Sequence, residues 1–199
     1  MKKNFFTILS LTLFSFGVMA QAPTQQWAKE YDNPNGGSNQ DTPEEGGIVV
    51  DGSGNSYVTG RSYNQSASYN IVTVKYDPSG VQLWSVEYDN GYNNTDEGKG
   101  ICLDAQGNVF VAGFVYNSNS YYDYITIKYD NNGNLLWSQT ANGSGNSYDN
   151  PSAITVDQNT GNVFVTGAMY TSNSYTDDYG TVAYDNNGNF LWKNYFYVS

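Results

Sequence analysis

Short apolar runs separated by turn residues recur along the chain. Ile48-Val49-Val50 leads into Asp51-Gly-Ser-Gly54-Asn55, and a second apolar run follows. In such a turn the Asp side chain can bond to its own backbone, Gly supplies a positive φ, and Asn tolerates the left-handed region. The pattern predicts β-hairpins, with positive φ at Gly54, Gly80, Gly107, Gly133 and Gly188. After residue 20 no window has the periodicity of a helix.

The hairpins belong to a repeat of about fifty residues. Trp27, Trp84, Trp137 and Trp192 stand 57, 53 and 55 residues apart. Each repeat holds two hairpins and therefore four strands, near 47–51, 55–60, 70–77 and 81–88 in the first copy. The repeats span about 47–88, 100–140 and 153–198.

Four strands at this period are typical of a β-propeller blade, because a small sheet must stack on its neighbours to bury both of its faces. Three blades are fewer than the roughly four to eight that close a propeller. Residues 27–31 predict one extra N-terminal strand, equivalent to the last strand of a blade. We therefore expect an all-β, β-propeller-like arc that cannot close alone. Either its open blade faces associate with other copies, or the chain is a piece of a larger propeller.

The repeated residues resemble one known family. The run Ile-x-Val-Asp-x-x-Gly-Asn-x-Tyr/Phe-Val-x-Gly is followed by Thr-x-Lys-Tyr-Asp-x-x-Gly-x-x-Leu-Trp, and together they resemble the SBBP bacterial β-propeller repeats over nearly all of residues 27–199. The resemblance implies a secreted or surface propeller, and most members have no assigned activity. The third copy departs from the pattern, with Ala183 in place of Lys75 and Lys128 and an extra residue near Thr160.

The N-terminus has the order of a secretory signal peptide. Two lysines precede an apolar stretch, and small residues precede Ala20, after which we expect cleavage; Ala22 is the second choice. The stretch is short for a membrane anchor, and no Cys follows it to carry a lipid. We expect a single domain over 21–199, outside the cell, in the periplasm or on the cell surface. Without the two lysines of residues 1–20, the net charge changes from −11 to −13. Such acidity argues against nucleic acid or an anionic membrane as partner.

The chemistry-bearing residues are few. Cys102 is the only cysteine, so we expect no disulfide framework; it is interpreted as a packed apolar residue, the alternative being a reactive thiol. No histidine is present, which excludes Ser-His-Asp and Cys-His nucleophile systems. The sequence predicts no catalytic residue, metal or cofactor.

Recognition is predicted on one face of the arc. The two Asp-x-x-Gly turns of each repeat lie at one end of its strands, and two longer connections lie at the other end. The longer connections at 61–70, 114–123 and 168–178 are rich in Tyr, Asn and Ser, which suit binding loops. The candidate residues are Tyr63, Tyr69, Tyr116, Tyr121, Tyr122, Tyr170, Tyr175, Asp177 and Asp178. The alternative is that these tyrosines only pack the loops. Asn131 and Asn132, in a tight turn, are predicted to have no part in binding.

Acidic residues also approach the first strand of each repeat. They are Glu44, Glu45, Asp96, Glu97 and Asp149. They could gather at the arc axis and hold calcium, or they could form a solvated rim. The adjacent Asp177 and Asp178 could serve a glycosidase only if the fold gave them the separation that hydrolysis requires.

Three functions remain open. The first is a non-catalytic module that binds a protein or a glycan through the long-loop face. The second is a self-assembling arc with lectin-like sites between blades. The third and most remote is an enzyme that acts on polysaccharides.

Overall fold

The structure is a computed structural model that describes residues 42–64, 68–172 and 176–197; the side chains of residues 42–46 are not described. The described residues form twelve strands and no helix, so none of their segments is a helix long and apolar enough to cross a membrane. The predicted strand at 27–31, the signal segment and Tyr175 lie outside these ranges.

The strands form three antiparallel sheets of four, each in chain order. Sheet 1 contains β1 (Thr42–Val50), β2 (Ser56–Asn64), β3 (Ser68–Tyr76) and β4 (Gln82–Tyr88). Sheet 2 contains β5 (Glu97–Leu103), β6 (Val109–Asn117), β7 (Tyr121–Tyr129) and β8 (Leu135–Ala141). Sheet 3 contains β9 (Asn150–Val156), β10 (Val163–Tyr170), β11 (Asp177–Tyr184) and β12 (Phe190–Phe196).

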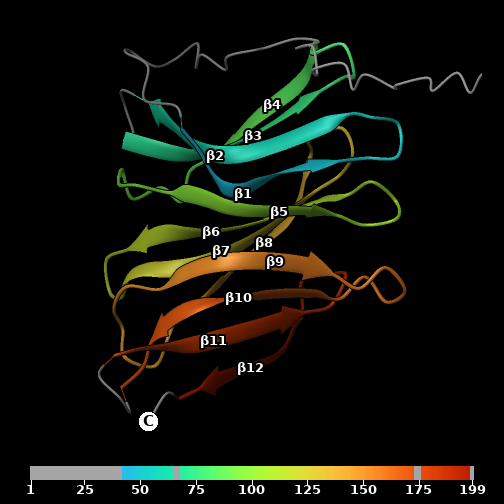
Figure 1. Cartoon of the computed structure of the whole chain (residues 1–199). Helices are drawn as coiled ribbons and strands as arrows, with labels where there is room; N and C mark the ends of the chain where they lie inside the picture. Colours follow the sequence, from blue (N-terminus) through green and yellow to red (C-terminus); the bar gives the residue numbers. More distant parts are fainter. Residues whose placement is uncertain (1–41, 65–67, 173–175, 198–199) are drawn as a thin grey trace, which may run out of the picture.

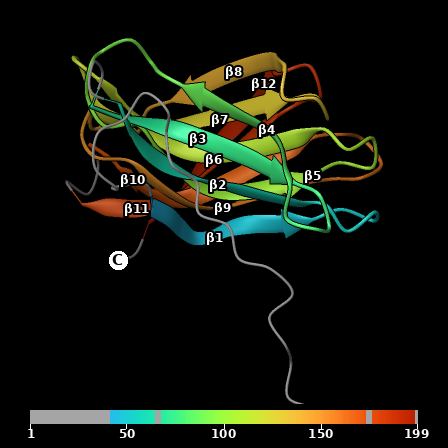
Figure 2. The same ribbon diagram turned by 90° about the horizontal axis from the view of Figure 1, so that it is seen from above.

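The sheets follow one another as consecutive blades of an open arc (Figure 1). Seen from above, the last strands β4, β8 and β12 lie toward one side of the stack, and β1 and β9 lie toward the other (Figure 2). The predicted all-β arc of three four-stranded blades is confirmed. The turn glycines are confirmed as well, because Gly54, Gly80, Gly107, Gly133 and Gly188 all have φ between 80° and 85°.

Two apolar cores lie between the sheets. The first joins sheets 1 and 2, with Tyr57, Ile71, Val111 and Ile127 among its fully buried members. The second joins sheets 2 and 3 and is built around residues such as Phe110. Sheet 2 is therefore covered on both faces, which explains why every residue of its central strand β6 from Val109 to Val115 is buried.

Cys102 packs at the edge of the second core. Burial raises the pKa of its thiol to about 12, and Asp104 adds to this shift. The thiol therefore stays protonated at neutral pH, as the packing interpretation predicts.

A repeated polar contact locks each sheet to the next. The Lys75 ammonium of sheet 1 donates to the side-chain and main-chain oxygens of Asn131, in the β7–β8 turn of sheet 2, and the Trp84 indole N–H donates to the Asn131 carbonyl at 3.0 Å. Lys128 and Trp137 of sheet 2 hold Asn186 of sheet 3 in the same way. We call this arrangement the lysine lock. The sequence indicates Asn131 only as a turn residue, whereas the structure gives it a second role between sheets.

Candidate functional site

The connections between the second and third strands of each sheet are strands for most of their length. Pairing continues to Asn64↔Ser68 in sheet 1, Asn117↔Tyr121 in sheet 2 and Tyr170↔Asp177 in sheet 3. The prediction of long loops at 61–70, 114–123 and 168–178 is wrong. Tyrosine has a high β-propensity, and alternation with Ser and Asn allows the ladder to run on to a tight turn. Each sheet therefore extends a two-stranded ribbon, at the end toward which β6 and β10 point in Figure 1.

The predicted tyrosines face one another across these ribbons. The rings of Tyr63 and Tyr69 lie 5.3 Å apart in edge-to-face contact, and those of Tyr116 and Tyr122 lie 5.5 Å apart. Tyr170 instead pairs with Asp177. Aromatic pairs of this kind stiffen a ribbon and leave ring surface available for contact.

Sequence reasoning missed aromatic residues that join the sheet 2 ribbon. Tyr122 also contacts Tyr148 at 4.9 Å and Phe114 at 5.1 Å, and Tyr92 contacts Tyr116 at 6.2 Å. Tyr92 and Tyr148 come from the connections that lead into β5 and β9. Both connections are polar and each carries one tyrosine, so the sequence does contain a signal that could have identified Tyr92 and Tyr148 as candidates.

Tyr121 stands at the tip of the sheet 2 ribbon with its side chain 65% exposed. Its φ is 65°, a left-handed conformation that is rare for a residue with a Cβ. Ser68, at the equivalent place in sheet 1, has φ 75°. A strained and exposed tyrosine is a candidate contact residue, because strain of this kind concentrates at functional positions.

We expect Tyr121→Gly to stabilise the fold by about 1 kcal/mol, because glycine enters the left-handed region without steric cost. Urea denaturation measures the change. Asn119→Gly in the same turn is the control and should not stabilise. A loss of stability in Tyr121→Gly would show that the ring contributes packing that outweighs the strain.

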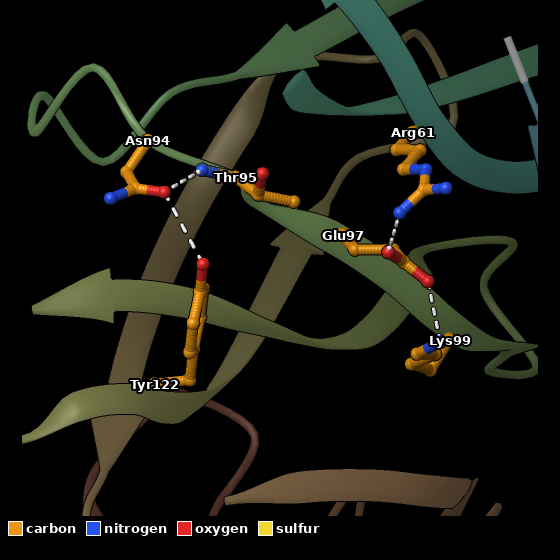
Figure 3. Close-up of polar contacts among 6 residues, drawn as sticks. All are labelled: Arg61, Asn94, Thr95, Glu97, Lys99 and Tyr122. Carbon is orange, nitrogen blue, oxygen red and sulfur yellow. Dashed lines mark hydrogen bonds and ion pairs between the residues drawn. The ribbon is translucent and has the colours of Figure 1, made fainter. Parts of the chain in front are cut away.

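A cluster of three charged residues lies where sheet 1 meets sheet 2 (Figure 3). The Arg61 guanidinium, from β2, donates to Glu97 Oε2 at 2.7 Å, and the Lys99 ammonium donates to Glu97 Oε1. Glu97 and Lys99 are two residues apart on β5, and their ion pair brings both side chains to this junction. The Glu97 side chain is only 4% exposed, while those of Arg61 and Lys99 are 34% and 21% exposed. The carboxylate is thus the inner member of the cluster, and the two cations are its outer members.

Aromatic rings flank the charged cluster. The Arg61 guanidinium lies 4.8 Å from the centre of the Tyr69 ring, and the Lys99 ammonium lies 5.5 Å from that of Phe114. Burial raises the pKa of Tyr148, and this pKa also responds to Glu97, Lys99 and Arg61. Asn94 is held close by, since its Oδ1 accepts hydrogen bonds from Tyr122 Oη and the Thr95 backbone (Figure 3). The junction thus combines fixed donors and an acceptor with partly exposed ring surface.

Asp96 and Asp149 do not gather with Glu97, and the side chains of Glu44 and Glu45 are outside those that the structure describes. Asp96 accepts hydrogen bonds from the backbone N–H groups of Asn90 and Tyr116, and its own N–H donates to the Tyr69 carbonyl. Asp149 makes the equivalent bonds in sheet 3. Each carboxylate fixes the connection between two sheets. Within the described residues no group of three or more acidic or sulfur ligands is arranged to hold a metal ion.

Burial raises the pKa of Asp96 and Asp149 to about 6 each, although backbone N–H donors act against this shift. The folded state therefore binds these two protons more tightly than the unfolded chain does. Their contribution to stability rises as the pH falls from 7 to about 4. The pKa of Asp51 is shifted in the opposite direction. Burial alone would raise it, but hydrogen bonds from Asn55, Ser53 and Tyr57 outweigh burial and lower the pKa to about 2. Its contribution is present above pH 4 and is lost as the pH falls toward 2.

We expect the melting temperature to be higher at pH 5 than at pH 7, with each of the two buried carboxylates contributing about 1 kcal/mol, because pH 5 lies about one unit below their raised pKa. Thermal unfolding at pH 7, 6 and 5 measures this. The control is the double variant Asp96→Asn/Asp149→Asn, in which most of the rise should disappear. A rise of equal size in the double variant would assign it to the falling net charge instead.

The pair Asp177 and Asp178 is separated by the strand geometry. Asp177 is exposed, while Asp178 is buried and accepts a hydrogen bond from the Thr171 hydroxyl. Asp123, its counterpart in sheet 2, accepts from Ser120 Oγ at 2.8 Å and Asn117 Nδ2 at 3.1 Å. Asp178 therefore fixes the ribbon turn, and the two neighbours do not face a common substrate position.

No family model matches the chain, so the resemblance to SBBP repeats stays a prediction. No curated protein matches it either. Among solved structures, a fucose lectin from Kordia zhangzhouensis, solved in complex with methyl-fucoside, is similar to it. That match has a TM-score of 0.46 and 14% sequence identity, and it covers 76% of this chain and 97% of the lectin chain. A likeness this distant carries no functional argument, so any function for this chain has to follow from its own geometry.

Proposed function

We propose that this protein is a non-catalytic module that binds neutral carbohydrate at the junction of sheets 1 and 2. The observation that carries the proposal is the buried Glu97 carboxylate held between Arg61 and Lys99. Sugar hydroxyls accept hydrogen bonds, so they match a site whose two partly exposed cationic donors are held in place by a buried carboxylate. Hydrogen bonds to charged groups are about twice as strong as neutral ones.

The aromatic surroundings support the same ligand. The rings of Tyr69, Phe114 and Tyr148 border the cluster, and Tyr148 is exposed. The C–H face of a sugar ring packs well on an aromatic ring, while the tyrosine hydroxyls stay available for polar contacts. A neutral sugar fits better than an anionic one, because a net charge of −11 over the whole chain repels anions.

The carboxylates favour binding over hydrolysis. Glycosidases need two carboxyl groups about 5–10 Å apart on either side of the scissile bond. Glu97 is committed to two cations, and the neighbouring Asp96 is committed to two backbone N–H groups. Within the proposal, neither is available as a general acid.

The test is calorimetric titration with neutral monosaccharides and oligosaccharides, beside a uronate-containing polysaccharide. Arg61→Met keeps the aliphatic stem over Tyr69 and removes the donors, so we expect at least tenfold weaker binding. Asn132→Ala, on the opposite end of the sheet, should bind as the wild type does. Unchanged affinity in Arg61→Met, binding of the uronate alone, or release of a hydrolysis product would contradict the proposal.

Export belongs to the same proposal, since a carbohydrate-binding module of this kind would act outside the cytoplasm. It is supported by the charged, apolar and small-residue order of residues 1–20. Sequencing the N-terminus of the protein released by its host should give Gln21. A mature chain that still begins at Met1 would contradict export.

A further inference from the structure

The charged cluster at the junction of sheets 1 and 2 leads into a row of aromatic rings. The Lys99 ammonium lies 5.5 Å from the centre of the Phe114 ring, and the Tyr148 ring lies 5.8 Å from that of Phe114. We call the following four rings the aromatic row: Tyr148, then Tyr122 at 4.9 Å, Tyr116 at 5.5 Å and Tyr92 at 6.2 Å, each distance measured from the ring before. Tyr148 is therefore the end of the row beside the cluster, and Tyr92 is the far end.

The two ends of the aromatic row are its most exposed members. Tyr148 is 47% exposed and Tyr92 is 48% exposed, whereas Tyr116 and Tyr122 are half-buried between them. Among the described residues the two end rings make no contact with each other, so the middle rings keep them apart. A sugar unit is about as wide as a tyrosine ring and cannot cover both ends at once. Two separated rings suit two sugar units of one chain.

Both ends of the row are held in place by hydrogen bonds to the sheet 2 ribbon. In the connection that carries Tyr92, Asn90 donates from its backbone to Asp96 at 2.8 Å and from its side chain to the Tyr116 carbonyl at 3.0 Å. In the connection that carries Tyr148, the next residue, Asp149, donates from its backbone to the Tyr122 carbonyl at 2.8 Å. The row is thus formed before a ligand arrives, which lowers the entropy cost of binding.

Asn94 places a polar group between the charged cluster and Tyr92. It lies two residues from Tyr92 and three from Glu97 along the chain that enters β5. Its Oδ1 accepts hydrogen bonds from Tyr122 Oη and the Thr95 backbone, which fixes the orientation of the amide. The amide nitrogen points away from both of these donors (Figure 3). A sugar hydroxyl beside Tyr92 can accept a hydrogen bond from this nitrogen.

We propose that the site takes a neutral oligosaccharide, with a second subsite formed by Tyr92 and Asn94. This inference rests on the proposed function, because the first sugar unit has to bind at the charged cluster. A later unit of the same chain packs its C–H face on Tyr92, and one of its hydroxyls accepts from Asn94 Nδ2. A monosaccharide fills the first subsite only. An oligosaccharide gains from both, since its second contact is made by a ligand that is already bound.

Calorimetric titration of the whole chain tests this inference. The probes are glucose, mannose, galactose and N-acetylglucosamine, each beside its own oligomers. In a series that binds, affinity should rise about tenfold from the monosaccharide to oligomers that reach Tyr92. Tyr92→Leu keeps an apolar contact with Tyr116 but has no flat ring, so it should lose this gain and keep the monosaccharide affinity. Tyr92→Phe should retain the gain. The matched control is Tyr179→Leu, at a 64% exposed tyrosine of sheet 3, and should bind as the wild type does.

The second subsite and the carbohydrate proposal fail in different ways. If wild-type affinity does not rise with oligomer length, or if Tyr92→Leu keeps the gain, the second subsite is wrong and the first stands. If no series binds, both are wrong. Arg61→Met should weaken monosaccharide and oligomer alike, whereas Tyr92→Leu should weaken the oligomer alone.

A second variant guards against damage to the fold. Asn94→Asp keeps the acceptor for Tyr122 and removes the amide donor, so the gain with oligomer length should fall several-fold without a change in ring packing. Urea denaturation of this variant and of Tyr92→Leu measures their stability. A full gain in Asn94→Asp would remove Asn94 from the second subsite, and loss of the gain in Tyr179→Leu would place the second contact away from the aromatic row.

Discussion

Gly113→Ala is expected to cost about 3 kcal/mol of stability and to lower the melting temperature by about 8 °C. Gly113 lies on β6 opposite a bulge, where the register of β5 shifts between Gly98 and Gly100. The bulge places the backbone of β5 directly over Gly113. An added Cβ would lie 3.1 Å from the Gly98 Cα and closer still to the Glu97 carbonyl oxygen. Backbone atoms on a paired strand cannot move aside as a flexible side chain would.

The same change should also disturb the charged cluster, because the displaced carbonyl belongs to Glu97. Gly167→Ala repeats the experiment in sheet 3, where an added Cβ would meet the backbone of Asn150 and Pro151. Gly52→Ala is the control, since an added Cβ there meets no atom within 4 Å, and its effect should stay within about 0.5 kcal/mol. Thermal unfolding of the three variants measures the difference. Equal, small effects would show that the strands can separate at the bulge.

Asn186→Ala is expected to cost about 2 kcal/mol, because it removes a side-chain acceptor from a buried ammonium. The Lys128 ammonium donates to Asn186 Oδ1 and to its carbonyl oxygen at 3.1 Å, and Lys128 is only 4% exposed. Burial lowers the pKa of Lys128, and Asp104 opposes the shift, so the lost acceptor leaves a charge that is already costly to bury.

A double-mutant cycle isolates the lysine lock. Lys128→Ala reproduces the residue that sheet 3 has naturally at Ala183, and in that background Asn186→Ala should cost much less than it does alone. Asn187→Ala, next in the turn and exposed, is the control. Denaturation midpoints of the wild type, the two single variants and the double variant give the coupling energy between Lys128 and Asn186. A coupling energy near zero would show that the lock contributes no more to stability than a solvent-exposed contact does.

The sequence predicts the turns and sheets because their causes are local. The spacing of Asp51, Gly54 and Asn55 determines a hairpin within five residues, and the structure shows Asp51 Oδ1 accepting from the backbone of Ser53 and Asn55. The ribbons were harder to predict because polar Tyr, Ser and Asn fit a paired strand as well as a loop. When only the residue pattern is known, the polar character of these residues does not distinguish an exposed paired strand from a loop.

The charged cluster could not be predicted from spacing. Arg61 and Glu97 are 36 residues apart and come from different sheets, and they meet only because β2 and β5 pack together. The irregular segment that places Glu97 there also has a different length in sheet 1, where the register shifts between Pro43 and Ile48, than in sheet 2, where it shifts between Gly98 and Gly100. Such register shifts depend on packing against the next strand, and a repeat alignment does not reveal them.

The lysine lock also sets an order of events while the chain is being made. Hairpins within a sheet close over a few residues, but the Trp84 to Asn131 bond spans 47 residues and the Lys128 to Asn186 bond spans 58. During synthesis or translocation, a sheet therefore emerges with its lysine and tryptophan unengaged until the second hairpin of its successor follows. Sheet 1 must wait for residue 131, and sheet 2 for residue 186. A chain stalled between these points would expose, side by side, a lysine and a tryptophan that are covered in the complete fold. Quality-control proteases and chaperones are suited to recognise such a surface.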